Sequence, residues 1–218
     1  LAATHRVVIP DLRNHGKTDR IRSRFEIADV ADEMAVLFDR MDLAGSPVVG
    51  YSMGGMVAQE LALRHPGFVD RLVLAASAAA PVQWPRWLSV PVMVGGRTLS
   101  RIDRTLLPRI AYRYLTLTGV FPPEHGEWLW QTLLDRDTDL YYESGFAVLR
   151  FDVRDRVGRL DVPVRSIIPT RDQLIPPSHQ RETARLFGAD VVELDGARHE
   201  AVMTHSAEMV KAIAEFAG

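Results

Sequence analysis

Short apolar runs alternate along the chain with longer stretches in which apolar residues recur every three or four positions. The short runs, rich in β-branched residues, predict buried strands, and the wider spacing predicts helices. Strands are expected at residues 5–9, 47–51, 71–76, 162–169 and 190–194. Helices are expected at residues 25–43, 53–65, 179–187 and 201–216. This alternation favours an α/β fold, in which a mostly parallel sheet carries helices on its faces.

The alternation stops in the middle of the chain. Apolar residues there are spaced as in helices, with no strand between them, at residues 102–115, 124–134 and 140–151. We therefore expect a helical cap at residues 78–160, inserted into an α/β core made of residues 1–77 and 161–218.

The expected cap has a composition of its own. It contains all four tryptophans and four of the five tyrosines of the chain, namely Trp84, Trp87, Trp128, Trp130, Tyr112, Tyr114, Tyr141 and Tyr142. These aromatic residues can form the core of the cap, roof an apolar substrate pocket, or do both. Six arginines lie within residues 86–113 and six carboxylates within residues 124–143. Pairing of oppositely charged helices is favoured over a nucleic-acid face, because an acidic neighbour of equal size would cancel the attraction for phosphate.

Composition excludes several classes of protein. The 218 residues are 47% hydrophobic and carry a formal charge of −2, so no overall field draws the chain to nucleic acid or to an anionic membrane. There is no cysteine, which excludes a disulfide scaffold and a thiol nucleophile. The longest apolar stretch, residues 72–82, is far shorter than the ~20 residues of a membrane span. No signal peptide is recognisable, and a cytoplasmic location is expected.

A candidate nucleophile lies between an expected strand and an expected helix. Gly50-Tyr51-Ser52-Met53-Gly54 matches the pattern G-x-S-x-G. A serine at such a sharp turn has a strained backbone and an exposed hydroxyl, and Gly50 and Gly54 are expected to avoid collisions across the turn. The Met53 N–H, at the start of the helix, is expected to stabilise an oxyanion. The alternative is a serine that caps an ordinary helix.

A serine nucleophile needs a base, and the base needs an acid. Of the seven histidines, His199 follows the strand at residues 190–194 and lies at its carboxyl end, where parallel sheets place active sites. Asp172 follows the preceding strand and is the expected acid. Asp195 is the competing acid, but it is close in sequence to His199 and is expected to form a turn with Gly196.

Together these residues resemble the α/β-hydrolase superfamily in its cap-bearing form. The segment Asp11-Leu12-Arg13-Asn14-His15-Gly16 resembles the family's D-x-R-G-H-G loop, with Asn14 where glycine is usual. Residues 50–55 match the nucleophile turn, and Asp172 and residues 196–199 match the acid and base loops. The resemblance implies a serine hydrolase of a small apolar ester or related acyl compound, with no cofactor. Its site would comprise Ser52, Asp172 and His199 with the Met53 N–H.

The chain departs from the family pattern before His5. The family normally has three further strands there, one of which lies between the strands at residues 5–9 and 47–51, and a His-Gly loop that supplies a second oxyanion N–H. We therefore expect an N-terminally truncated α/β-hydrolase fold, with Val7 and Val48 on strands separated by a gap or drawn into another pairing. Two alternatives to an active esterase are a small-molecule receptor without turnover and an inactive fragment that lacks half its oxyanion hole.

Overall fold

Four parallel strands form one sheet, and they lie side by side in the order in which they occur in the chain. The computed structural model describes residues 1–82, 85–118, 120 and 123–218. The strands in these residues are β1 (Ser46–Tyr51), β2 (Val69–Ala75), β3 (Val164–Pro169) and β4 (Asp190–Leu194). The register places Tyr51 opposite Ala75 and Pro169 opposite Leu194, so the carboxyl ends of the strands share one edge of the sheet.

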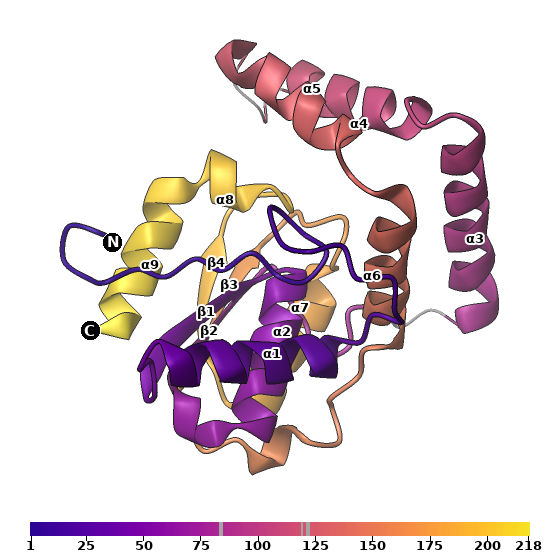
Figure 1. Cartoon of the computed structure of the whole chain (residues 1–218). Coiled ribbons are helices and arrows are strands. Elements are labelled where there is room, and N and C mark those ends of the chain that lie inside the picture. The colour runs from indigo at the N-terminus through magenta and orange to yellow at the C-terminus, as the bar shows by residue number, and fades with distance from the viewer. Residues whose placement is uncertain (83–84, 119, 121–122) are drawn as a thin grey trace.

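Helices cover both faces of this sheet (Figure 1). They are α1 (Ile27–Arg40), α2 (Met53–Arg64), α7 (Pro177–Phe187), α8 (Ala201–Thr204) and α9 (Ser206–Ala217). Side chains of β2 alternate between two cores: Leu72 and Leu74 belong to the cluster with α1 and α2, whereas Val73 and Ala75 belong to the cluster with α9. The parallel sheet with flanking helices confirms the predicted fold class.

Residues 5–9 form no strand, and the prediction of one there is wrong. The side chain of Val7 is 42% exposed and that of Ile9 is 88% exposed. In the described residues, β1 is the last strand on its side of the sheet. A β-branched run becomes a strand only where a neighbouring strand takes up its N–H and C=O groups, and residues 5–9 have no such neighbour in the described part of the chain. Since this segment is not a strand, neither the gap nor the alternative strand pairing expected between Val7 and Val48 arises.

The residues between β2 and β3 are helical, as expected. They form α3 (Arg86–Ile102), α4 (Leu106–Leu117), α5 (Gly126–Leu134) and α6 (Thr138–Arg150). Figure 1 shows α3, α4 and α5 standing away from the sheet, with α6 closer to it. Short 3-10 helices occur at Pro66–Phe68, Pro123–His125 and Val157–Arg159. The boundaries of the cap at residues 78 and 160 stay a prediction.

One predicted cap helix is wrong in its limits. The helix expected at residues 102–115 is α4, which begins only at Leu106 and ends at Leu117, while Ile102 is the last residue of α3. The sequence did not indicate α3, because Pro91 and the pair Gly95-Gly96 disfavour a helix.

Ion pairs hold α3 against α6. Arg97 lies 2.9 Å from Asp139 and 3.1 Å from Glu143, and Arg101 lies 2.8 Å from Asp139. The hydrogen bond from Arg97 holds the pKa of Asp139 below its ordinary value. These contacts confirm that oppositely charged helices pair inside the cap.

The cap aromatics have different surroundings. Tyr112 and Trp130 meet edge to face with 5.6 Å between ring centroids, beside a small buried cluster of Leu129 and Leu133. This pair fits the cap-core interpretation. By contrast, Trp87 is 73% exposed and Trp128 is 63% exposed. Trp84 lies outside the described residues. No helix in the described ranges has both the length and the apolar character that a bilayer crossing requires.

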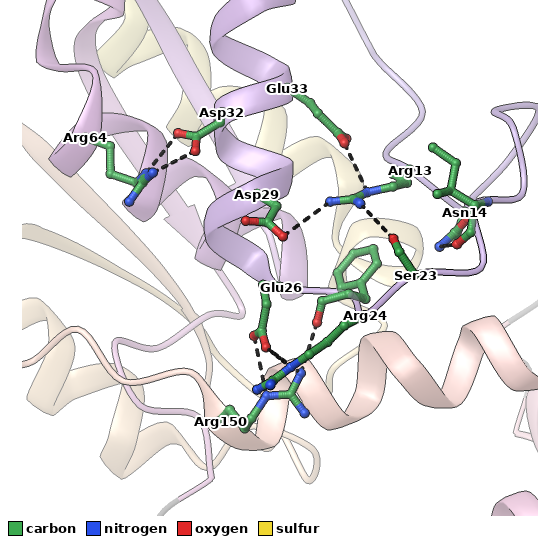
Figure 2. Close-up of polar contacts among 12 residues, drawn as sticks. Arg13, Asn14, Ser23, Arg24, Glu26, Asp29, Asp32, Glu33, Arg64 and Arg150 are labelled. Atoms are coloured by element: carbon green, nitrogen blue, oxygen red, sulfur yellow. Dashed lines mark hydrogen bonds and ion pairs between the residues drawn. The ribbon is translucent and has the colours of Figure 1, made fainter.

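Arginines attach the helical insertion to the core. At the end of α6, Arg150 donates a 3.0 Å hydrogen bond to the carbonyl oxygen of Phe25 and lies 3.2 Å from Glu26 (Figure 2). Further along, Arg156 donates a 3.0 Å hydrogen bond to Glu60 of α2, whose side chain is only 6% exposed. The segment that leaves the cap is thus fixed to the helix that follows Ser52.

A second group of contacts joins α1 to α2. Arg64 binds both carboxylate oxygens of Asp32, as Figure 2 shows, and His65 Nε2 lies 2.7 Å from the same carboxylate. The hydrogen bond from Arg64 is the main cause that lowers the pKa of Asp32 from 3.8 to about 2. A lowered carboxyl pKa adds stability above the unfolded value, and this stability is lost as the pH falls through the folded value. The effect is modest, because the Asp32 side chain is 42% exposed.

Arg156→Ala is expected to lower the free energy of unfolding by about 3 kcal/mol, because it leaves the buried Glu60 carboxylate without its partner. Arg154→Ala is the matched control, since it removes an arginine from a pair with Asp152 in which both side chains are more than 40% exposed. That change is expected to cost less than about 1 kcal/mol. Urea denaturation measures both values, and equal losses would contradict the importance of the Glu60 contact.

Candidate active site

Ser52 occupies the sharp turn between β1 and α2, called the elbow below (residues 50–55). Its backbone has φ 53° and ψ −121°, in the positive-φ region that residues other than glycine rarely adopt. Two hydrogen bonds hold the turn: Ser52 N–H donates to the carbonyl of Ala75, and Gly55 N–H donates to the carbonyl of Ser52, each at 2.9 Å. The strained serine backbone expected from the sequence is therefore present.

Gly50 and Gly55 make the elbow possible, whereas the prediction named Gly50 and Gly54. A Cβ on Gly50 would lie 2.4 Å from the Cα of Gly55, which confirms the role expected for Gly50. A Cβ on Gly54 would meet no heavy atom within 4 Å, so the role expected for Gly54 is wrong. The second close approach occurs at Gly55, whose Cβ would lie 2.5 Å from the Cβ and Oγ of Ser77. The Gly54-Gly55 pair was visible in the sequence, but only the packing of Ser77 below the turn distinguishes its two members.

The Ser52 hydroxyl faces a histidine and does not cap the helix. Its side chain makes no capping hydrogen bond to α2, so the alternative of an ordinary helix cap does not hold. Ser52 Oγ lies 3.0 Å from Nε2 of His199, and Nδ1 of the same ring lies 2.8 Å from Oδ2 of Asp172. The structure thus brings together the three residues that follow β1, β3 and β4, as expected for the shared edge of a parallel sheet.

The Asp172 carboxylate is completely buried, and every hydrogen bond it accepts restrains it. Its side chain has 0% exposure. Oδ1 accepts hydrogen bonds from the backbone N–H groups of Leu174 and Ile175, each at 2.9 Å. Oδ2 accepts from Nε2 of Gln180 at 3.0 Å, in addition to its contact with His199. These donors replace the water that burial removes, so that the carboxylate can stay charged.

Asp195 lies in the turn expected for it. Its carboxylate accepts a 3.3 Å hydrogen bond from the hydroxyl of Thr170, and the same hydroxyl accepts a 2.8 Å bond from the N–H of Gly196. Gly196 has φ 72°, as this tight turn requires. Among the described residues, the acid that contacts His199 is Asp172.

Tyr51 supports His199 from the strand side. Its ring centroid lies 5.8 Å from that of His199, and its hydroxyl donates a hydrogen bond to the His199 carbonyl oxygen. Burial is the main cause that raises the pKa of Tyr51 to about 12. The phenol therefore remains a neutral donor over the working range of a histidine base. The sequence motif marks this position only as variable, and the contact was not predicted.

The Met53 N–H is available as a donor at the start of α2. Within the ranges that the structure describes, no protein atom accepts a hydrogen bond from it. A helix N-terminus next to a nucleophile favours negative charge. The role of this N–H as an oxyanion donor stays a prediction.

The loop at residues 11–16 accepts asparagine in place of the usual glycine for a local reason. Asn14 has φ 66°, a conformation that asparagine tolerates better than most residues. Its side chain also closes the loop, because Nδ2 donates to the Ile21 carbonyl at 3.1 Å and Oδ1 accepts from the Ile21 N–H at 2.7 Å. Figure 2 shows the neighbouring Arg13 reaching Glu33 of α1, which lies 3.1 Å from its Nε. In the described part of the chain, no group of three or more His, Asp or Glu side chains could hold a metal ion.

Comparison with known proteins agrees with this architecture. The model of the family described as the alpha/beta hydrolase fold matches residues 1–206. The chain belongs to this family, and it is a hydrolase. A pimeloyl-[acyl-carrier protein] methyl ester esterase from Neisseria meningitidis serogroup B (strain H44/76) is 30% identical over 214 residues, which cover 94% of this chain and 80% of the relative.

Solved structures show the same fold. The enol-lactonase from Burkholderia xenovorans LB400 is 26% identical and matches with a TM-score of 0.77, over 94% of this chain and 78% of its own. The esterase EaEST from Exiguobacterium antarcticum matches with a TM-score of 0.81 over 95% of this chain and 79% of its own. At 18% identity, this second likeness concerns the fold alone.

Gly55→Ala is expected to lower the free energy of unfolding by about 1–3 kcal/mol, because the added methyl group overlaps Ser77 in a packed turn. Gly54→Ala, the adjacent control, places the same methyl group in open space and is expected to change stability by less than about 0.5 kcal/mol. Thermal or urea unfolding distinguishes the two. Greater damage at Gly54 would show that the assignment of the close approach to Gly55 is wrong.

Proposed function

We propose that the chain hydrolyses carboxylic esters through an acyl-enzyme formed on Ser52. The hydrogen-bonded series from Ser52 through His199 to Asp172 is the observation that carries this proposal. A serine hydroxyl is a weak nucleophile until a base accepts its proton, and this series supplies a base in contact with the hydroxyl. The acid on the far side of the imidazole keeps a proton on Nδ1, so that Nε2 has a free electron pair facing Ser52.

In the first half of the reaction, Ser52 Oγ attacks the ester carbonyl while His199 Nε2 accepts the hydroxyl proton. The carbonyl oxygen becomes an oxyanion, which the Met53 N–H stabilises. The tetrahedral intermediate then collapses, the bond to the alcohol oxygen breaks, and the imidazolium returns its proton to the departing alcohol. Asp172 stays ionised and stabilises the imidazolium throughout.

In the second half, water takes the place of the alcohol. His199 accepts a proton from the water as its oxygen attacks the acyl carbonyl. The second tetrahedral intermediate collapses, the bond to Ser52 Oγ breaks, and the proton returns to Ser52. The carboxylic acid leaves, and the free enzyme is restored. Each proton moves between groups on this chain, the substrate and water, so the reaction needs no cofactor.

The substrate class follows from the relatives. The Neisseria protein is named as a methyl ester esterase and the Burkholderia protein as an enol-lactonase, and both names denote cleavage of a carboxylic ester bond. We infer that this chain acts on a small ester with an apolar acyl part. An apolar acyl group suits ligand pockets, which generally have few polar groups.

A fluorophosphonate probe is expected to label wild-type protein at Ser52, and Ser52→Ala is expected to abolish both labelling and hydrolysis of a p-nitrophenyl ester. Ser178→Ala is the control, since it removes an exposed serine on α7 and should leave labelling unchanged. Mass spectrometry of the labelled peptide identifies the site. Labelling that survives Ser52→Ala would refute the assignment, and binding of the ester without repeated turnover would support the receptor alternative.

Asp172→Asn is expected to lower kcat by about 10⁴, because the base loses the group that sets its tautomer and stabilises its charged form. Asp195→Asn is expected to change kcat far less, since its carboxylate contacts Thr170 in a surface turn. Steady-state kinetics on one ester measures both variants. The reverse ranking would identify Asp195 as the acid partner.

A further inference from the structure

We propose that Gln180 is a positioning residue for the acid: its side-chain amide fixes the Asp172 oxygen that holds His199. This inference rests on the proposed function, because it concerns how the acid of that same site is oriented. Gln180 lies in the first turn of α7 and has 0% exposure.

The amide of Gln180 uses both of its hydrogens. Nε2 lies 3.0 Å from Oδ2 of Asp172 and 2.8 Å from the carbonyl oxygen of Ile175. Both of these neighbours only accept hydrogen bonds when Asp172 is ionised, so the NH₂ group must face them. Gln180 therefore ties the carboxylate to the backbone of the loop that carries it.

The oxygen of the amide has no hydrogen-bond partner among the described residues. Oε1 of Gln180 is buried and accepts no hydrogen bond in the described structure. A buried amide with an unsatisfied oxygen is unfavourable, and an apolar side chain of similar volume would fill the same space without that cost. The residue is thus poorly suited to packing alone, and its two donated hydrogen bonds are what distinguish it from leucine or methionine.

The position of these bonds determines what Gln180 can do. Oδ1 of Asp172 is already held by two backbone N–H groups, whereas among the described residues Oδ2 is held only by Gln180 and His199. Without the amide, the imidazole would be the one remaining partner of Oδ2 among these residues. The carboxylate would then be less restrained, and more of its negative charge would be available to stabilise the imidazolium.

Other ionisable groups near the pair do not reproduce this effect. Tyr51 packs against the His199 ring, and burial raises its pKa to about 12, so it stays neutral. Glu200, next to His199 in sequence, and Asp195, in the adjoining turn, are carboxylates and cannot donate to Asp172 when ionised. These groups are unchanged in every variant proposed below.

The test compares Gln180→Met and Gln180→Glu with Thr183→Val, measured as kcat and kcat/KM for a p-nitrophenyl ester across pH. Methionine keeps the volume and removes the donors. Thr183 is a matched control because it lies on the same helix, is 2% exposed, and accepts a 2.8 Å hydrogen bond from the Ala79 N–H without contacting Asp172. Thr183→Val is expected to lower stability and to leave the pH profile unchanged.

Gln180→Met is expected to lower kcat about tenfold with KM little changed, which is the scale of one hydrogen bond to a charged group. The acidic limb of the kcat/KM profile of this variant is expected to move to higher pH, because the imidazolium is stabilised. The activity of Gln180→Met relative to wild type therefore falls further as the pH is lowered. In Gln180→Glu the deficit in kcat is expected to depend on pH in the opposite sense, because the donor is lost only when the glutamic acid ionises. A protonated glutamic acid can donate to Asp172 Oδ2, whereas an ionised one repels it, so the deficit of this variant grows as the pH rises.

The NMR titration of the His199 imidazole gives a second readout that needs no substrate, and it should shift in the same direction as the acidic limb. Wild-type kcat and an unmoved limb in Gln180→Met would refute the positioning role. A loss of stability alone, as in Thr183→Val, would also refute it. Gln180→Glu is nearly isosteric, so it decides the question if the methionine variant does not fold. Asp172→Asn, measured in parallel, separates this proposal from the proposed function. Wild-type activity in Asp172→Asn would contradict the proposed function, whereas wild-type behaviour in Gln180→Met alone contradicts only the role of Gln180.

Discussion

Ser52 has a positive φ because β1 must turn at once into α2, and the geometry of the site depends on this turn. The turn exists only because Gly50 and Gly55 approach each other more closely than two Cβ atoms would allow, while Ser77 fills the space below. Relaxing the backbone of Ser52 would move its hydroxyl away from His199 and would also change where α2 begins. The strain is thus tied to the two features that the proposed chemistry needs: an exposed nucleophile and a free N–H beside it.

Burial of a carboxylate is the second constraint. Asp172 follows the end of β3 in a fully buried position, and the backbone of its own loop, Gln180 and His199 all contact its carboxylate through hydrogen bonds. A second buried carboxylate, that of Glu60 on α2, lies below the elbow and is paired with Arg156. Asp172 is satisfied mainly by nearby residues with His199 as its distant partner, whereas the partner of Glu60 lies 96 residues away in sequence. Packing of the loops and of the insertion therefore stabilises the site as well as the fold.

Sequence patterns predicted most of the core because local and tertiary preferences agree there. The strands at residues 46–51, 69–75, 164–169 and 190–194 and the meeting of Ser52, Asp172 and His199 follow from apolar periodicity and from the geometry of parallel sheets. The predictions fail where contacts between distant parts of the chain determine the local structure. In the described part of the chain, residues 5–9 have strand-forming side chains but no neighbouring strand. Helix α3 forms although it contains Pro91, and its Arg97 pairs with Asp139 and Glu143 of α6.

The residues that support the site from behind, without being part of the series Ser52–His199–Asp172, were the least predictable from sequence. Nothing in the sequence distinguishes Gly55 from Gly54, and Gln180 is one polar residue among several in an amphipathic helix. Each acts on a partner placed by another part of the chain, Ser77 in one case and Asp172 in the other. Such roles depend on distances between elements, which a periodic pattern does not encode.

Whether Ser52 carries the acyl group during turnover can be measured directly. Rapid mixing with p-nitrophenyl acetate, followed by acid quench and peptide mass spectrometry, reports where the acetyl group is at each time. A Ser52 acyl-enzyme predicts a burst of nitrophenol close to one per chain, with the acetyl group on the peptide that contains Ser52 and its loss at the steady-state rate. Turnover of the ester with no acetyl on Ser52, or with acetyl on another residue that clears at the turnover rate, would contradict it.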